Sequence, residues 1–120
     1  MKSKPVILRA MASRDIDEAI AHYLDQSADA AALGFIDALE QAYLHISRHA
    51  ATGSPRYAHE LNLQGLRFWP LSRYPHLVFY REMDDHIDVW RVLHGPDGHP
   101  NSPTYGHPKF PHPDRGVTAA

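Results

Sequence analysis

The sequence contains no cysteine among its 120 residues. The absence of thiols excludes disulfide bonds, thiolate metal sites and a cysteine nucleophile. No run of apolar residues approaches the ~20 that are needed to cross a bilayer, and the first residues do not resemble a signal peptide. We therefore expect a cytoplasmic protein without a membrane partner.

Lysine is also scarce: three lysines stand against nine arginines, and the formal net charge is −2. A chain with this charge lacks the strongly basic surface that sequence-independent nucleic-acid binding requires. We expect no direct, high-affinity DNA binding by the chain alone. The charges are unevenly distributed, because residues 13–50 carry seven acidic residues against two arginines, while residues 66–94 carry four of each sign.

Motifs of several catalytic and cofactor-binding classes are missing as well. The seven glycines are isolated, so the chain has no glycine-rich phosphate loop, and no G-x-S-x-G nucleophile elbow occurs. Ten histidines are present, but they do not follow the spacing of metal ligands. We therefore expect neither a cofactor nor a metal site.

The remaining composition is that of a globular domain, with 43% hydrophobic and 22% charged residues. The length suffices for one domain with its own core. From Gly95 onward the composition changes, since six of the last 26 residues are proline and four are glycine. We predict a domain over residues 1–95 and a tail over residues 96–120 that is flexible or lies across the surface.

The apolar pattern in the first half predicts a short strand and two helices. Residues 5–9 form a short apolar run, which is typical of a strand. Helical spacing then covers residues 14–26, with Ser13 as the expected N-cap and acidic residues in the first turn. A second helical stretch begins after Ser27 and ends near His49. Because only two or three residues separate the stretches, the helices should form an antiparallel hairpin.

The second half predicts a loop followed by three strands. Residues 51–65 show no clear period and are expected to be a loop. Three runs rich in β-forming residues follow, over residues 66–71, 77–82 and 87–94. Connections of turn length join them, so they should form an antiparallel meander.

The last strand run is apolar on both faces. Strict alternation puts Val89 and Leu93 on one face and Trp90 and Val92 on the other, so this strand should lie inside the sheet. The predicted fold class is therefore α+β: an N-terminal strand, a two-helix hairpin packed on one face of an antiparallel sheet, and a three-stranded meander. The buried residues should include Phe35, Ile36, Leu39, Leu77, Phe79 and Val89.

The strand arginines, Tyr80 and His94 are the residues that could carry chemistry. Arginine recognises carboxylates and phosphates through a planar, bidentate fork, and histidine can transfer protons near neutral pH. One interpretation is a metal-free nuclease, with Arg67 and Arg81 around the phosphate, His94 as acid or base, and Tyr80 as a second candidate. The other is a surface that binds a protein partner, formed by Arg67, Arg73, Arg81 and Arg91.

Six short segments carry a resemblance to a known family. They are Ala12 to Ile16, Gly53-Ser54-Pro55-Arg56, Gly65-Leu66-Arg67, Arg73-Tyr74-Pro75, Leu77-Val78-Phe79-Tyr80-Arg81 and Arg91-Val92-Leu93-His94-Gly95. In this order and spacing they resemble the RelE/ParE toxin superfamily, and in particular its ParE branch, the toxins of type II toxin–antitoxin (plasmid stabilisation) systems. The order of strand, helical hairpin and meander is also that of the superfamily.

The resemblance implies a toxin that binds and inhibits DNA gyrase and that a cognate antitoxin neutralises. RelE-like members instead cut mRNA on the ribosome with basic residues of the sheet, and that pattern would map onto Arg67, Arg81 and His94. Because such nucleases are usually strongly basic, the charge of this chain favours the gyrase inhibitor. Family members commonly follow His-Gly with a segment that ends in Arg-Asp, whereas here Gly95 precedes Pro96-Asp97-Gly98. An inactive scaffold that retains only partner binding is therefore a further alternative.

Overall fold

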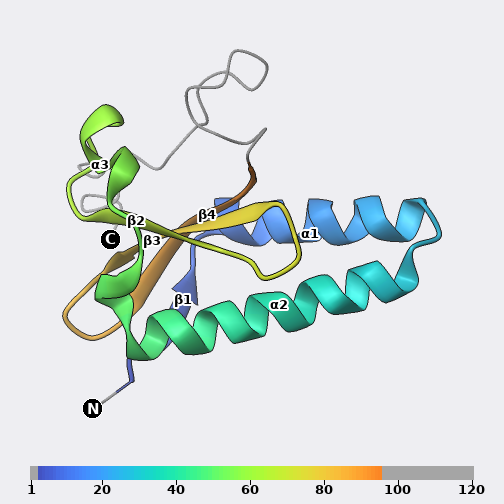
Figure 1. Cartoon of the computed structure of the whole chain (residues 1–120), viewed down its shortest axis with the longest axis horizontal. Helices are drawn as coiled ribbons and strands as arrows, with labels where there is room; N and C mark the ends of the chain where they lie inside the picture. Colours follow the sequence, from blue (N-terminus) through green and yellow to red (C-terminus); the bar gives the residue numbers. More distant parts are fainter. Residues whose placement is uncertain (1–2, 96–120) are drawn as a thin grey trace.

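The structure, a computed structural model, describes residues 3–95. Its elements follow the predicted α+β order (Figure 1). They are β1 (Val6–Leu8), α1 (Ala10–Asp25), α2 (Asp29–Arg48), η1 (Ala50–Thr52), α3 (Arg56–Glu60), β2 (Leu66–Pro70), β3 (His76–Glu82) and β4 (Ile87–His94). The predicted tail over residues 96–120 lies outside the described residues. Within the described part, no helix has the length and apolar character to traverse a bilayer.

The sheet has the strand order β1-β4-β3-β2. Strands β2, β3 and β4 form the predicted antiparallel meander. Strand β1 instead pairs with β4 in parallel, with Val6 opposite Ile87, so the sheet is mixed rather than antiparallel throughout. A parallel neighbour requires a long connection, and here the helical hairpin and the first two meander strands supply it. Strand β4 lies inside the sheet, as its two apolar faces predicted.

Helix α1 begins before the predicted N-cap at Ser13. The Arg9 N–H still donates to the Val89 carbonyl of β4, at 2.9 Å, and the Ser13 N–H already donates to the Arg9 carbonyl, at 3.0 Å. The strand therefore passes directly into the helix, and no side chain caps it. The earlier start places Asp15 beyond the first turn, where its side chain reaches β4.

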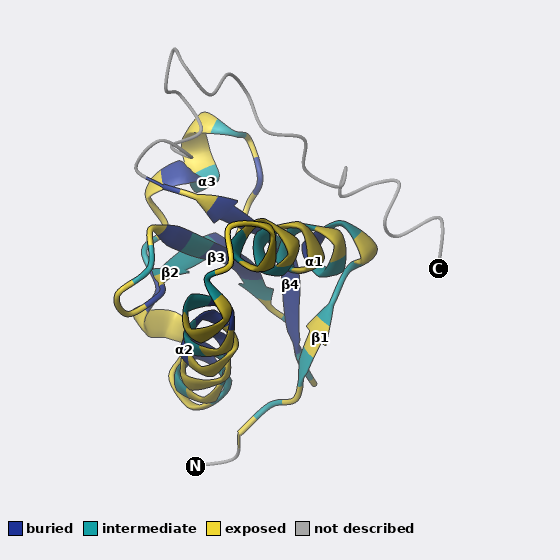
Figure 2. Ribbon diagram, turned by 90° about the vertical axis from the view of Figure 1, so that its right-hand side faces the viewer, coloured by how far each residue is buried: buried dark blue, intermediate teal, exposed yellow. Residues whose placement is uncertain are grey.

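The strands are largely buried, as their colouring in Figure 2 shows. Two apolar clusters account for this burial, one on each face of the sheet. The helical hairpin packs on one face, around a cluster that includes Phe35 and Tyr80. The opposite face carries a second cluster, in which Tyr57 of α3 packs with Phe79 and Trp90. The segment expected to be a loop over residues 51–65 thus contains most of η1 and the short helix α3, which closes this second cluster.

A β-bulge in β4 decides which residues enter each cluster. The consecutive residues Phe79 and Tyr80 of β3 face residues of β4 that are two positions apart, so Trp90 is the extra residue. Beyond the bulge, Val92 joins the cluster beneath the hairpin, and Leu93 joins Trp90 on the opposite face. Strict alternation had placed Val92 with Trp90, and this prediction was wrong because a bulge shifts the alternation by one residue.

Four of the six predicted core residues are buried, namely Phe35, Leu39, Phe79 and Val89. Ile36 is 38% exposed, because it directly follows Phe35 on α2 and is turned away from the stripe that faces the sheet. Leu77 is half-buried at the border of the second cluster.

Candidate functional site

The residues predicted to carry chemistry lie toward two different ends of the sheet. His94 ends β4 and is paired with His76 at the start of β3. Arg81 lies near the other end of β3, and at about 3.3 Å per residue its Cα is about 16 Å from that of His76. Arg67 is paired with Tyr80, whereas Arg81 is paired with Leu66, so the Arg67 and Arg81 side chains start from opposite faces of the sheet. The structure therefore brings neither the two arginines nor His94 together into one site.

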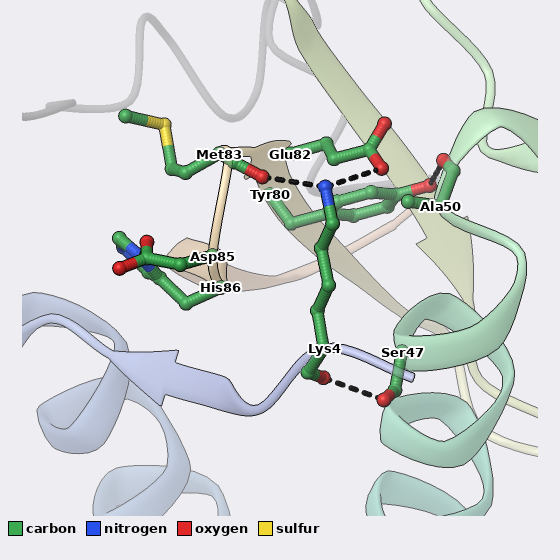
Figure 3. A network of polar contacts seen from close by, with 8 residues as sticks. All are labelled: Lys4, Ser47, Ala50, Tyr80, Glu82, Met83, Asp85 and His86. Carbon is green, nitrogen blue, oxygen red and sulfur yellow. Dashed lines mark hydrogen bonds and ion pairs between the residues drawn. The ribbon is translucent and has the colours of Figure 1, made fainter. Parts of the chain in front are cut away.

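Tyr80 lies in the core rather than at the surface. Its side chain is fully buried, and its hydroxyl donates to the Ala50 carbonyl (Figure 3). Burial raises the pKa of Tyr80, although a hydrogen bond with the Gly53 backbone and the charge of Arg67 act in the opposite direction. A buried phenol that already donates its proton cannot contact a substrate in this arrangement. Its role here is to fix η1 against the sheet.

Arg91 is held inside the molecule by a bidentate ion pair with Asp15 of α1. The Arg91 Nε and Nη2 atoms donate to the two carboxylate oxygens at 2.7 and 2.8 Å, and the Val92 N–H donates to the same carboxylate at 3.0 Å. The two side chains are only 14% and 10% exposed. Bidentate geometry with little solvent makes this one of the stronger polar contacts of the fold, and it ties α1 to β4.

The other three arginines are less constrained. Arg67 donates to the Gly53 carbonyl at 2.7 Å. Arg73 lies exposed in the turn between β2 and β3, with a φ of 70°. Within residues 3–95, neither Arg73 nor the half-buried Arg81 forms an ion pair. Of the four arginines predicted to bind a partner, these two make neither an ion pair nor a side-chain hydrogen bond with the described residues.

A pair of imidazoles at the ends of β3 and β4 was not predicted from the sequence. The His76 ring is 7% exposed, and its centroid lies 4.8 Å from that of Phe35 and 5.1 Å from that of His94. Burial, with a smaller contribution from the charge of His94, lowers the pKa of His76 to about 4. A hollow of about 680 Å³ adjoins the pair and is also lined by His22 and Glu18. No three carboxylate or imidazole groups of the described residues are arranged to hold a metal ion.

Comparison with known proteins identifies the family to which this fold belongs. The family model described as "ParE toxin of type II toxin-antitoxin system, parDE" matches residues 6–97. The chain belongs to the ParE toxin family. As a ParE-type chain it is a toxin of a type II toxin–antitoxin system, which agrees with the resemblance of its sequence segments.

A solved structure described as "Chromosomal ParDE TA system from P. aeruginosa" is similar to this ParE-family chain. The TM-score is 0.63 at 20% sequence identity, and the match covers 77% of this chain and 96% of that one. At this identity the similarity establishes the fold alone. No curated protein matches the sequence.

The sequence analysis of the ParE-family chain also did not single out one buried acidic residue, Asp88. Asp88 of β4 is 7% exposed and accepts hydrogen bonds from the Arg9 guanidinium, at 2.8 to 3.2 Å, and from the Trp90 indole, at 2.9 Å. The Arg9 guanidinium also lies over the Trp90 ring, 4.8 Å from its centroid. Because Asp88 is fully engaged by these neighbours, its role is to connect the start of the chain to β4. No motif in the sequence links two residues so far apart.

Proposed function

We propose that this ParE-family chain inhibits DNA gyrase by binding to it in the cytoplasm, and that a cognate antitoxin neutralises it. The observation that carries the proposal is the separation of His94 from Arg67 and Arg81. Binding requires only an accessible, complementary surface, which the unpaired Arg73 and Arg81 can provide. The antitoxin segment is disordered when free and folds along the domain, so that a small protein covers a large surface.

The same separation counts against the alternative, a ribosome-dependent mRNA endonuclease. A metal-free ribonuclease needs a base for the 2′-hydroxyl, an acid for the leaving oxygen and cations around the phosphate, all within contact of one nucleotide. His94 lies about 16 Å along the sheet from the arginines, and Tyr80 is buried with its hydroxyl engaged. These four residues do not form one site in the described fold.

The test is a gyrase supercoiling assay run beside a ribosome-dependent mRNA cleavage assay on the purified chain. We expect inhibition of supercoiling and intact mRNA. The substitution His94→Ala should leave the inhibition unchanged. Reversing the charge of either arginine, in Arg73→Glu or Arg81→Glu, should weaken the inhibition of supercoiling about tenfold or more, because like charges across an interface are costly. Arg14→Glu, an exposed position on α1, is the control with the same change of charge.

The opposite pattern would overturn the proposal. If the chain cuts mRNA, if His94→Ala removes about 10²–10⁴-fold of that activity, and if supercoiling is unaffected, the chain is a nuclease. If both assays are silent, the chain is a scaffold that retains only partner binding.

A further inference from the structure

A groove that has not yet been described borders the C-terminal end of α2. A hollow of about 580 Å³ lies between the second half of α2 and the end of β2, and its lining includes Arg48, His49 and Trp69. A second hollow, of about 310 Å³, lies around η1 and also includes Arg48 and His49 in its lining. The two hollows therefore adjoin at the last turn of α2. Together they are named the α2 groove.

Basic side chains outnumber acidic ones in the lining of the α2 groove. Lys4 and Arg48 carry positive charge, His45 and His49 add two imidazoles, and among the described lining residues Glu82 is the only carboxylate. The Lys4 ammonium donates to Glu82 at 3.0 Å and to the Met83 carbonyl at 2.7 Å (Figure 3). The charge of Glu82 is thereby offset inside the groove. Arg48 is exposed and makes no ion pair within residues 3–95.

The dipole of α2 explains only part of this charge. Cations are favoured in the last turn of any helix, because they lie beside its unpaired carbonyl groups. That argument covers Arg48 and His45 but not Lys4, which comes from the segment before β1, and the opposite wall over residues 69–72 is uncharged. Other parts of the surface of α2 do carry acids, such as Asp37 and Glu40.

The wall of the α2 groove is aromatic and held in place. The His45 ring stacks on Trp69, with centroids 3.9 Å apart and planes at 16°. The Thr52 hydroxyl donates its single proton to the His49 carbonyl, at 2.6 Å, so it must accept from the His45 Nε2 atom at 2.8 Å. This fixes the His45 ring against the indole. Leu44, 50% exposed, adds an apolar residue at the rim.

We propose that the α2 groove is the docking site for an acidic segment of the antitoxin, in which apolar side chains alternate with carboxylates. This proposal rests on the proposed function, since it presupposes an antitoxin. The carboxylates would meet the Arg48 guanidinium, and the apolar side chains would lie on Trp69 and Leu44. A segment that folds on binding can follow two joined hollows, whereas a folded target presents a broad surface. A nucleic acid would need many more cations than this groove supplies.

The experiment uses the full chain and, as probe, the full-length product of the small reading frame adjacent to its gene. The two proteins are co-purified, separated and titrated back together, and the dissociation constant is measured at low and moderate salt. Arg48→Glu should weaken binding about tenfold or more, and Leu44→Ser should weaken it about fivefold, by loss of charge and apolar contact respectively. Arg14→Glu is the matched control and should stay within about twofold of wild type.

Tryptophan emission locates the binding site independently. Trp90 is 1% exposed, so a change of emission on binding should come from Trp69. In Trp69→Phe, the antitoxin should still bind, and the change of emission should disappear. Because Arg48 is exposed, Arg48→Glu should fold, and unchanged circular dichroism would verify this.

Each other outcome overturns the proposal in a recognisable way. If wild type and Arg48→Glu bind the antitoxin equally, the groove is not the docking site, while the proposed function stands. If Arg48→Glu loses inhibition of gyrase but keeps antitoxin binding, the groove belongs to the target. If the wild-type chain binds no product of the adjacent frame and inhibits no supercoiling, the proposed function fails together with this inference.

Discussion

Lowering the pH should destabilise the fold through one imidazole, that of His76. Burial lowers its pKa in the folded state to about 4, from an ordinary value of 6.5. Between these two values the unfolded chain binds a proton that the folded chain does not, so stability falls as the pH falls. Above about pH 6.5 the His76 ring does not reduce the free energy of unfolding. The reduction then grows progressively as the pH falls to about 4.

The size of the effect follows from the two pKa values. One pKa unit corresponds to about 1.4 kcal/mol, so protonation of His76 should remove about 2 kcal/mol between pH 7 and pH 5. That is a large part of the roughly 5–15 kcal/mol that holds a domain together. The His76 Nδ1 atom is buried with no hydrogen-bond partner among the described residues, so the fold offers no acceptor to that side of a charged ring.

Urea unfolding at pH 7 and at pH 5 measures this contribution. In His76→Gln, which cannot titrate, the loss of free energy between the two pH values should be smaller by about 2 kcal/mol than in wild type. The comparison uses the difference within each variant, so a general destabilisation of His76→Gln does not affect it. The matched control is His59→Gln, at an exposed position of α3, which should lose as much stability as wild type. If His76→Gln loses as much as wild type, the buried imidazole is not responsible.

Two further substitutions test the contacts that position the sheet and the helices. Asp15→Ala leaves the Arg91 guanidinium without its carboxylate in a largely buried place and should lower the free energy of unfolding in urea by about 3 kcal/mol. The same change at the exposed Asp17 should lower it by less than about 0.5 kcal/mol. Equal losses would refute the structural role of the ion pair. Gly53→Ala would place a methyl group against the Tyr80 hydroxyl and should cost about 1–3 kcal/mol through overpacking, which a thermal melt would detect and an unchanged melting temperature would contradict.

The local features of the fold could be read from the sequence because they depend on neighbouring residues. The helical period around Phe35 and Leu39 predicted the long helix α2, and the short turns predicted the meander. Helix α3 has five residues, which is little more than one turn, so no apolar period could develop. The early start of α1 was missed because Ser13 is a good N-cap by type, whereas pairing of Arg9 with β4 decides where the helix begins.

Features of the candidate site depended on contacts between distant residues. The bulge at Trp90 arises from the register of β3 against β4, which the residues of one strand cannot specify. The same register brings His76 beside His94, although the sequence placed these histidines 18 positions apart. The arginines showed the same limit, since their types indicated binding, but only the structure distinguished the paired Arg91 from the unpaired Arg81.

The parallel pairing of β1 with β4 has a consequence for the order of events during synthesis. Lys4 contacts Glu82 and Arg9 contacts Asp88, over sequence separations of 78 and 79 residues. Contacts between such distant residues form slowly, and strand β1 has no neighbour in the sheet until β4 has left the ribosome. The helical hairpin can form early, but β1 cannot join the sheet until β4, the last strand, is made. A nascent or truncated chain would therefore lack the complete four-stranded sheet. Harm to the cell would begin only after the whole domain is released, when an antitoxin already present could bind it.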